Sequence, residues 1–314
     1  MKRLQYRRRG GPEVLEWAEA DEPTPGPKEI VVEVRAASVN PTDIKMRTGE
    51  LGVANMFEPS PRGMGLDFAG VVRSLGPGVS TVAPGDAVMG LSAPRFRGFA
   101  DLVKIKADQV RRIPDGLDFA EASTLPMGAA TGAKVAAKYL TPRRGRQDHR
   151  VAVLGAGGGI GLYAVQFARD AGSLVTAVAG GGAADALQSF GLEEVLDYRT
   201  QSLAARRGRY DTIIDLSDRY MYGDVEAVLA PDGCFRTMTP SLRHLWTLTT
   251  NRRAKPAFAI ADTDGLDRAV EAVRGKRLVT NVGATFPMEE AIEVLRDYEE
   301  GRLKAVGKVV LTRS

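Results

Sequence analysis

Cysteine and histidine are nearly absent from this sequence. Its 314 residues include one cysteine, Cys234, and two histidines, His149 and His244. A lone cysteine excludes internal disulfides and any zinc site built from several cysteines. The apolar neighbours of Cys234 favour a buried, inert thiol over a nucleophile. Redox chemistry, if the protein performs any, therefore depends on a bound cofactor.

The sequence also lacks long hydrophobic runs. No window approaches the roughly 20 uninterrupted apolar residues that span a bilayer, and no apolar signal core follows the basic residues near the N-terminus. We therefore expect a cytoplasmic protein without a membrane partner. With 44% hydrophobic residues, the chain is long enough to bury a large core in two domains.

Clustered positive charge is missing as well. The formal net charge is +4, but the basic residues occur in short, scattered groups with acidic residues distributed among them. No nucleic-acid-binding signature is present in the sequence. We interpret the charges as solvated surface and expect no nucleic-acid partner.

Two patterns of secondary structure follow one another along the chain. In the first third, short apolar runs alternate with turns rich in proline and glycine, which predicts a β-rich, barrel-like domain. From about residue 120, a helical stretch over 120–140 precedes strands that alternate with helices, which predicts a doubly wound parallel sheet. The expected strands are 151–154, 174–179, 195–197, 212–216 and 234–238, and the expected helices are 160–171, 183–190 and 223–229.

The C-terminal segment contains one more helix and one more strand. The stretch "FPMEEAIEVLRDYEEG" has one apolar helix face, and "GKVVLT" is typical of a strand. The pattern alone does not assign this segment to either domain.

A glycine-rich loop joins an expected strand to an expected helix in "VLGAGGGIGLYAVQFARDAG". Glycines at such a junction let the backbone approach a pyrophosphate, while the helix presents free N–H groups and the positive end of its dipole. The two possible frames read Gly155-x-Gly157-x-x-Ile160 and Ala156-x-Gly158-x-x-Gly161, so neither is a complete G-x-G-x-x-G. The order of strand, loop and helix still favours dinucleotide binding over a tight structural turn.

The residues that would distinguish NAD from NADP follow the next expected strand. Near Gly180, "TAVAGGG" has no acidic side chain to bind the adenosine 2′-hydroxyl, which favours NADP. No arginine or lysine stands immediately beside Gly180 to bind a 2′-phosphate, and the nearest candidates along the chain are Tyr198 and Arg199. We therefore expect NADPH as the cofactor, with NADH as the alternative.

Seven motifs follow one another along nearly the whole chain: "GGPEVLEW", "ASVNPTDIKMRTG", "GLDFAGVVRSLGPGVSTVAPGDAVMG", "GFADLV", "AASTLPMGAATG", "VLGAGGGIGLYAVQFARDAG" and "EEVLDYRT". In this order they resemble the medium-chain dehydrogenase/reductase superfamily, and within it the zinc-independent quinone oxidoreductase branch. The resemblance implies an α/β protein with a doubly wound parallel sheet (Rossmann) domain at 120–283. It also implies a β-rich, GroES-like catalytic domain made of 1–119 and 284–314.

The resemblance further implies a site without zinc. Zinc-dependent members carry a cysteine in the "NPTD" region and a His-Glu pair in the "GLDF" region, where this sequence has Asn40-Pro41 and Leu66-Asp67. The cysteine-rich lobe that holds a second zinc is also missing. We expect no metal ligand role for His149 or His244.

A site without a metal suits a substrate that is already electrophilic. Quinones and α,β-unsaturated carbonyls accept hydride at a conjugated carbon, and the negative charge moves to oxygen. Many quinone reductases of this branch have a tyrosine where this chain has Lys45. Lys45 is similar instead to the lysine of enone-reducing relatives with an "N-P-x-D-x-K" pattern, where an ammonium stabilises or protonates that oxygen. A solvated loop lysine is the alternative interpretation.

Three further residues near Lys45 receive expected roles from the same resemblance. Asn40 is the second catalytic candidate and should contact the nicotinamide or its ribose. Asp43 should cap the backbone N–H groups of Lys45 or Arg47. Asp67 is either a pocket carboxylate or a structural one, and the structural role is favoured.

Motif positions also assign a cofactor-binding set. It comprises Asn40, Thr131, Ala156, Gly158, Gly159, Ile160, Gly161, Gly180, Tyr198 and Thr239. Thr131 and Thr239 should lie near the nicotinamide and its ribose, the loop residues around the pyrophosphate, and Tyr198 against the 2′-phosphate. The usual serine and basic residues around that phosphate are replaced by "GGGAAD", which departs from the pattern.

The sequence thus predicts a zinc-independent, NADPH-dependent oxidoreductase that transfers hydride to a quinone or an enone. The alternative is a non-catalytic NADP(H)-binding protein of the same fold, and an enoyl-thioester reductase stays open. The resemblance implies a homodimer. The segment "AFAIA" at 257–261 is a candidate edge strand for pairing two copies, or the sixth strand of the sheet, or both.

Overall fold

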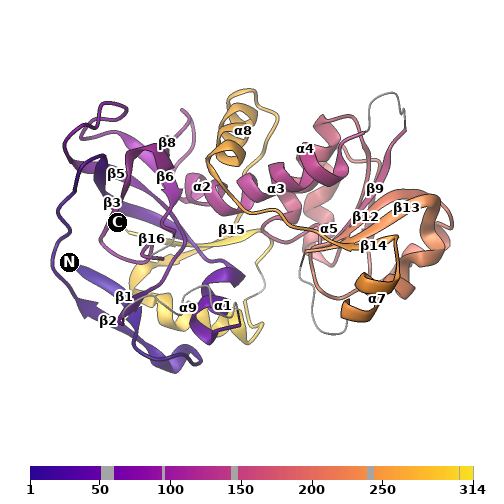
Figure 1. Cartoon of the computed structure of the whole chain (residues 1–314), viewed down its shortest axis with the longest axis horizontal. Helices are drawn as coiled ribbons and strands as arrows, with labels where there is room; N and C mark the ends of the chain where they lie inside the picture. Colours follow the sequence, from indigo (N-terminus) through magenta and orange to yellow (C-terminus); the bar gives the residue numbers. More distant parts are fainter. Residues whose placement is uncertain (51–59, 94–95, 143–147, 239–243, 304, 314) are drawn as a thin grey trace. The chain divides into compact units, whose positions relative to one another are not determined.

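The computed structural model describes residues 1–50, 60–93, 96–142, 148–238, 244–303 and 305–313 (Figure 1). The chain forms two compact units. The first comprises Met1–Met127 and Thr280–Ser314, and the second comprises Gly128–Val279. Within the described ranges, no helix combines the length and the apolar character needed to cross a bilayer.

The second unit is built on a six-stranded sheet in which every neighbouring pair is parallel. The strand order is β11-β10-β9-β12-β13-β14. The bounds are β9 (Arg150–Leu154), β10 (Leu174–Ala179), β11 (Glu194–Asp197), β12 (Tyr210–Asp215), β13 (Leu229–Thr237) and β14 (Ala254–Pro256). The order reverses direction at β9, as in doubly wound sheets, whose ligands bind beyond the carboxyl ends of the strands at this point.

Helices cover both faces of this sheet (Figure 1). The helices are α3 (Ala130–Val135), α4 (Gly161–Asp170), α5 (Gly182–Leu187), α6 (Tyr222–Val225), α7 (Leu245–Thr250) and α8 (Thr263–Arg274). Side chains of α3, α4 and α5 share one buried cluster with the strands. Residues of α6 share a separate cluster on the opposite face, against which Leu248 of α7 packs. The predicted doubly wound α/β fold is therefore confirmed.

The first unit is rich in antiparallel strands. Its larger sheet has the order β15-β16-β3-β5-β6-β8, with β7 also paired to β3, and its smaller sheet has the order β2-β1-β4. The bounds are β1 (Lys2–Tyr6), β2 (Leu15–Glu19), β3 (Glu29–Ser38), β4 (Arg62–Gly63), β5 (Asp67–Leu75), β6 (Ala87–Leu91), β7 (Leu102–Lys106), β8 (Val110–Arg112), β15 (Val282–Pro287) and β16 (Lys308–Thr312). Apolar residues from both sheets form one core.

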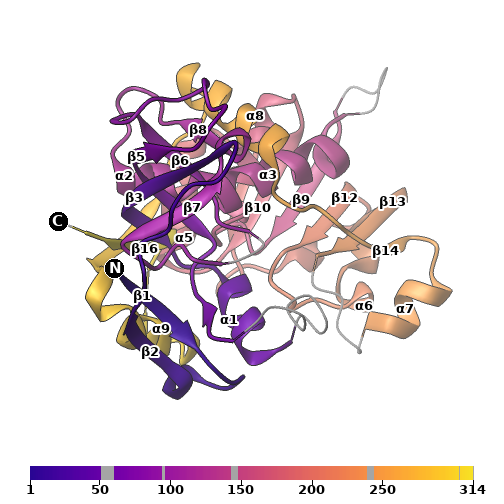
Figure 2. The ribbon, with the colours of Figure 1, turned by 60° about the vertical axis from the view of Figure 1, so that its left-hand side comes forward.

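Helices α1 (Pro41–Thr48), α2 (Phe119–Ser123) and α9 (Ala291–Glu299) complete the first unit. Figure 2 shows α9 beside the hairpin of β1 and β2, where the indole Nε1 of Trp17 donates to the carbonyl of Glu289 at 3.2 Å. The C-terminal helix and strand thus belong to this unit, as the resemblance implied.

The boundaries between the units differ from those predicted at 119/120 and 283/284. The first lies eight residues later, after Met127, because α2 packs against β3 and β5. The second lies four residues earlier, after Val279. The reason is that β15 already begins at Val282 and pairs with β16.

The sixth strand of the parallel sheet also differs from the prediction. It is β14, which ends at Pro256, whereas residues 257–261 form no strand. Ala257 still donates its backbone N–H to Thr237 at 2.8 Å. The next residue, Phe258, donates to the hydroxyl of Tyr139 instead, which draws the chain out of the sheet. The alternative that "AFAIA" forms the sixth strand is therefore wrong by a few residues, since that strand is Ala254–Pro256.

Candidate functional site

The glycine loop lies between β9 and α4 and is packed too tightly for side chains. A Cβ atom at Gly161 would lie 2.4 Å from the carbonyl oxygen of Gly155, and one at Gly157 would lie 2.4 Å from the Cβ of Ala183. Gly155 has a φ of 78°, which favours glycine. Helix α4 begins without a side-chain cap at Ile160. The N–H groups of Leu162 and Tyr163 already donate to the carbonyls of Gly158 and Ile160. The N–H groups of Ile160 and Gly161 are therefore the ones at this helix start that can serve a bound anion.

The start of α3 lies beside this loop. A Cβ at Gly128 would lie 2.8 Å from the carbonyl of Gly159, and one at Gly132 would meet Tyr163 of α4 at 2.8 Å. Thr131 stands between these two close approaches and is buried. Helix α3, which carries Thr131, therefore packs beside the loop that contains Ala156, Gly158, Gly159, Ile160 and Gly161. Their cofactor contacts stay predictions.

Beyond the end of β10, the ring of Tyr198 lies over Gly180. A Cβ at Gly180 would be 2.7 Å from two ring carbons of Tyr198. Tyr198 is 44% exposed, and Arg219 donates to its hydroxyl at 3.1 Å. The guanidinium of Arg219 lies 5.5 Å from the ring centroid, which is within cation–π range. This arrangement, which we call the Tyr198 rim, comprises Gly180, Tyr198 and Arg219.

A second arginine, Arg199, lies over Gly181, where a Cβ would be 2.9 Å from its Nη1. Its charge is balanced by Asp197, whose Oδ2 lies 2.7 Å from Nη2. Asp197 also accepts the backbone N–H of Gly181 at 3.2 Å. The hydrogen bond from the Arg199 side chain holds the pKa of Asp197 well below its usual range. Arg219 has no carboxylate partner in the part of the chain that the structure describes.

The loop that carries Arg219 is ordered by Asp215, the buried last residue of β12. One carboxylate oxygen of Asp215 accepts from the backbone N–H of Ser217 at 2.8 Å and from its hydroxyl at 2.6 Å. The other accepts from the N–H of Tyr220 at 3.2 Å. Arg219 therefore stands on a constrained turn. Sequence reasoning missed it, although loops that follow parallel strands meet at one sheet edge.

In the first unit, Lys45 lies on α1 and is partly buried, and no side-chain partner is found for it among the described residues. The helix is held from its other side by Arg47. This fully buried guanidinium bonds the carbonyl of Gly10 and the carboxylate of Glu299 on α9. Lys45 thus lies on an anchored helix, and its ammonium is unengaged within the ranges that the structure describes.

Asn40 is buried and its side chain is engaged within the chain. Its Nδ2 donates to the carbonyl of Ser38 at 3.2 Å and to Asp67 Oδ2 at 2.9 Å. Its Oδ1 accepts from the ammonium of Lys308, which also lies 3.3 Å from Asp67 Oδ2. Asp67 is therefore structural in this arrangement. Asn40 as a catalytic or cofactor contact stays a prediction.

Asp43 caps α1 in a different way from that expected. Its Oδ2 accepts the backbone N–H of Asn40 at 2.9 Å, not those of Lys45 or Arg47, because a side chain at the third helical position reaches back to the N-cap. Asp43 is fully buried, and this burial raises its pKa to about 7. Nearby Asp67 acts in the same direction, whereas the bond from Asn40 and the charge of Lys308 oppose the increase.

Two family models match the chain: the alcohol dehydrogenase GroES-like domain over residues 26–115 and the zinc-binding dehydrogenase family over residues 190–311. The chain belongs to the medium-chain dehydrogenase/reductase superfamily. It is similar to the chloroplast envelope quinone oxidoreductase homolog of Arabidopsis thaliana, with 28% identity over 331 residues, 99% of this chain and 98% of that protein.

Two more comparisons agree with membership of this superfamily. The mitochondrial NAD(P)H oxidoreductase RTN4IP1 of Mus musculus is 28% identical over 329 residues, which cover 91% of this chain and 82% of that protein. The quinone oxidoreductase from Coxiella burnetii has a TM-score of 0.85 and 25% identity, over 100% of this chain and 99% of that chain. The resemblance to quinone oxidoreductases is confirmed, and the β-rich unit is the GroES-like domain of this superfamily.

Among the described residues, the side chains that could bind a metal are dispersed or bonded to other groups. Across the described ranges, no three His, Cys, Asp or Glu side chains cluster as a metal site would require. His149 contacts the hydroxyl of Ser173 at 3.2 Å, and His244 contacts the carbonyl of Tyr220 at 3.1 Å. Cys234 is half-buried rather than buried as predicted. Its neighbour is the hydroxyl of Thr212 at 3.9 Å, because the two residues are register partners on the paired strands β12 and β13.

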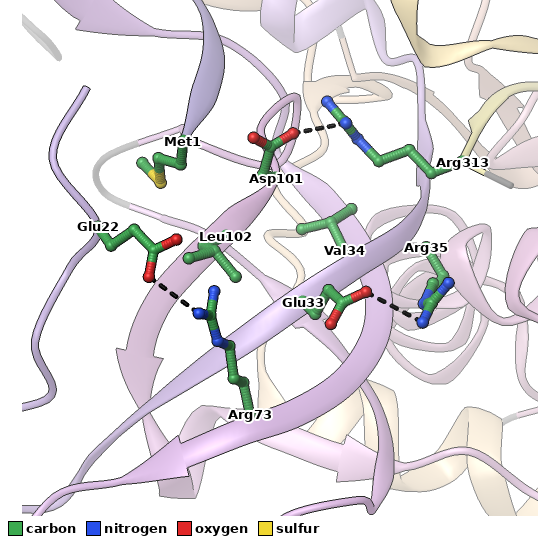
Figure 3. Close-up of a pocket in the computed structure, with 9 residues that line it drawn as sticks. All are labelled: Met1, Glu22, Glu33, Val34, Arg35, Arg73, Asp101, Leu102 and Arg313. Carbon is green, nitrogen blue, oxygen red and sulfur yellow. Dashed lines mark ion pairs between the residues drawn. The ribbon is translucent and has the colours of Figure 1, made fainter. Parts of the chain in front are cut away.

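A surface pocket of about 280 Å³ in the GroES-like unit contains none of the predicted site residues (Figure 3). Its charged side chains neutralise one another in three ion pairs. These are Arg73 with Glu22 at 3.0 Å, Arg35 with Glu33 at 3.0 Å, and Arg313 with Asp101 at 2.5 Å. The predicted sites therefore lie elsewhere, at α1 and at the ends of β9 and β10.

Finally, Thr239 lies outside the described residues. Its expected position beside the nicotinamide ribose therefore stays a prediction.

Proposed function

We propose that this chain is an NADPH-dependent oxidoreductase that reduces a quinone or an α,β-unsaturated carbonyl without zinc. NADPH supplies a hydride when it is bound. The chain's own residues bind the cofactor, orient the substrate and stabilise the charge that develops on its oxygen. The relatives called quinone oxidoreductase or NAD(P)H oxidoreductase support this reaction class.

The observation that carries the proposal is the cationic Tyr198 rim. A dinucleotide with a 2′-phosphate needs a positive group beside the end of β10. Arg219 meets this need, because it lies at the rim and has no carboxylate partner in the described part. Arg199 is already neutralised by Asp197 and should contribute less. The glycine loop would hold the pyrophosphate, since its close approaches leave no room for side chains.

The surroundings of Asn40 and Asp67 support a reaction without zinc. These two residues stand where the zinc-dependent members carry metal ligands, and the buried ammonium of Lys308 lies between them. A second cation beside this ammonium would be repelled strongly in a buried setting. Without a Lewis acid, the substrate has to be electrophilic already, as quinones and enones are.

We assign to Lys45 the stabilisation of the substrate oxygen. Hydride addition to the conjugated carbon breaks the carbon–carbon π bond and leaves an enolate or hydroquinone anion, which then takes a proton on oxygen or carbon. The ammonium of Lys45 has no described side-chain partner and can donate a hydrogen bond to this oxygen. An alanine at this position should lower kcat by about 100-fold, within the range of general acid–base effects.

A steady-state assay tests the proposed reaction. Purified protein is mixed with NADPH or NADH and with para-benzoquinone or cyclohexenone, and the loss of reduced cofactor is followed. The proposal predicts faster oxidation of NADPH and full activity after treatment with phenanthroline. Loss of activity with the chelator contradicts the absence of zinc.

The second candidate is a non-catalytic NADP(H)-binding protein of the same fold. The Tyr198 rim and glycine loop would serve it equally well. Cofactor binding without reduction of either substrate favours this candidate. Equal rates for the wild type and Lys45→Ala would remove only the role assigned to Lys45.

The homodimer is also a proposal, supported by exposed apolar side chains just after the edge strand of the sheet. Phe258 and Ile260 follow the edge strand β14 and are 62% and 81% exposed. Large apolar side chains at an edge commonly mark a contact with another chain. Light scattering after size-exclusion chromatography should give the wild type a molar mass twice that of one chain. The double variant Phe258→Asp with Ile260→Asp should give the mass of one chain. A cytoplasmic location is proposed as well, and cell fractionation tests it.

A further inference from the structure

Four chain segments place polar side chains at one buried point of the GroES-like unit. Ser38 ends β3, Asn40 precedes α1, Asp67 begins β5 and Lys308 begins β16. All four are at most 5% exposed. The pairing explains their meeting: Val310 is opposite Ser38, and Val39 donates to the carbonyl of Val309, so Lys308 falls beside Asn40. We call this set the Lys308 cluster.

The Lys308 cluster fixes the amide of Asn40 in one orientation. The amide nitrogen of Asn40 donates to two oxygen acceptors, the Ser38 carbonyl and the Asp67 carboxylate. The amide oxygen of Asn40 accepts from the Lys308 ammonium. A flipped amide would place its oxygen against two oxygens and its NH₂ group against a cation. Both contacts would be repulsive, so the ammonium determines which way Asn40 points.

Stability alone does not account for this cluster. A buried ion pair often contributes no more than apolar residues of the same volume, because desolvation of both charges offsets their attraction. One oxygen of Asp67 and one of Asp43 are buried without a hydrogen-bond partner among the described residues. Such an arrangement is costly, and its best-attested use is to select one geometry.

The geometry it selects is that of α1. Asn40 is the N-cap of this helix, where its backbone N–H donates to the Asp43 carboxylate and its carbonyl accepts the N–H of Asp43 at 3.0 Å. The other side of the helix is tied to α9 by the buried pair of Arg47 and Glu299. Lys45 lies between these two anchors. Any tilt of Asn40 would therefore move the ammonium of Lys45.

We propose that Lys308 is a positioning residue of the reductase site, which acts through Asn40 to fix α1 and Lys45. The catalytic part of this inference, that Lys308 places Lys45 for reduction, rests on the proposed function. The placement of Asn40 by Lys308 can be tested without any assumption about the reaction. Lys308 itself transfers no proton and touches no substrate in this account.

The experiment compares three variants with the wild type. Lys308→Met removes the charge and keeps the length of the side chain. The double variant Lys308→Met with Asp67→Asn removes both buried charges and so restores charge balance. Lys104→Met is the matched control, because Lys104 is also a strand lysine paired to a carboxylate, at 3.4 Å from Glu29, but it is only partly buried.

The measurements are thermal unfolding, NADPH titration, kcat and KM with para-benzoquinone, and hydrogen exchange of the α1 backbone. We expect the double variant to regain most of the Tm lost by Lys308→Met. Its kcat should stay about 10- to 100-fold below the wild type, since small misplacements reduce rate, and any loss of NADPH affinity through Asn40 should be smaller than the loss in kcat. Exchange in α1 should be faster in both variants and unchanged in Lys104→Met.

Two results would overturn the inference. In the first, the double variant regains kcat together with Tm, so the cluster only balances charge. In the second, exchange in α1 is the same in all proteins, so Lys308 does not hold this helix. A wild type that reduces neither quinone nor enone overturns the proposed function instead, and the exchange data then decide alone whether Lys308 positions α1.

Discussion

The Lys308 cluster and the Tyr198 rim use charged groups in opposite ways. The cluster is closed: its ammonium, carboxylate, amide and hydroxyl bond one another in a buried place. The rim is open: Tyr198 and Arg219 lie at the surface, and the arginine bonds only a neutral hydroxyl among the described residues. Buried charges that satisfy one another hold geometry, whereas an exposed charge without a counterion is available to a ligand.

The largest expected effect is the loss of a buried charge from the closed cluster. Asp67→Asn leaves the Lys308 ammonium without its carboxylate and should lower the free energy of unfolding by about 3–5 kcal/mol. Chemical denaturation at neutral pH measures this change. Arg219→Ala in the open rim should change it by less than about 0.5 kcal/mol. Equal losses in the two variants would abolish the contrast between the regions.

The next effect concerns the glycine loop that adjoins the rim. Gly161→Ala places a Cβ 2.4 Å from a backbone oxygen that cannot move freely. The loop should shift and weaken NADPH binding by about 100-fold or more, equivalent to about 2.7 kcal/mol. Gly223→Ala is the control, because a Cβ there meets nothing within 4 Å. Tight NADPH binding by Gly161→Ala would show that the loop is not the pyrophosphate site.

A third effect follows from Asp43, which borders the Lys308 cluster. Its pKa is raised to about 7 by burial, and Asp67, Lys308, Tyr298 and Asn40 surround it. The folded state therefore holds this proton more tightly than the unfolded state. The stability it contributes is fully present below the unfolded pKa of about 4 and is lost as the pH rises to about 7.

Asp43→Asn removes this dependence, because the amide stays neutral and still accepts the N–H of Asn40. The Tm advantage of the variant over the wild type should grow from about pH 5 to about pH 8, with each kcal/mol worth about 2–4 °C. Thermal scans at the two pH values measure it. A constant difference would mean that Asp43 is ionised throughout.

The smallest effect is the response of the open rim to salt. Raising the ionic strength from about 0.05 M to about 0.5 M should weaken NADPH binding several-fold and change NADH binding little, since exposed charges are screened. Parallel titrations with both cofactors measure this. Equal salt dependence would mean that the rim does not bind the 2′-phosphate.

What the sequence could predict depends on how local each signal is. The parallel sheet and the glycine loop follow from periodicity and from neighbours in the chain. The contact of Asn40 with Lys308 joins residues 268 positions apart, and no local pattern reports it. The sequence offered one indication of a buried charge here, the lysine of the otherwise apolar strand "GKVVLT".

The rim shows the same limit on a shorter scale. Tyr198 was predicted beside the 2′-phosphate from its motif, but Arg219 stands 21 residues later in an irregular loop. Its position depends on the bonds from Asp215 to Ser217 and Tyr220, which only the folded chain brings together. Strand ends could be anticipated, whereas the loop geometry between them could not.

The most direct test of the proposed function is a fluorescence titration with NADPH and with NADH. It compares the wild type with Arg219→Ala and with the control Arg274→Ala, whose exposed arginine ends α8. The account predicts that the wild type and the control bind NADPH at least about tenfold more tightly than NADH. Arg219→Ala should lose about 10- to 100-fold in NADPH affinity alone, as expected for a charge-assisted contact. Equal affinity for both cofactors, or an Arg219→Ala variant that keeps the preference, would contradict it.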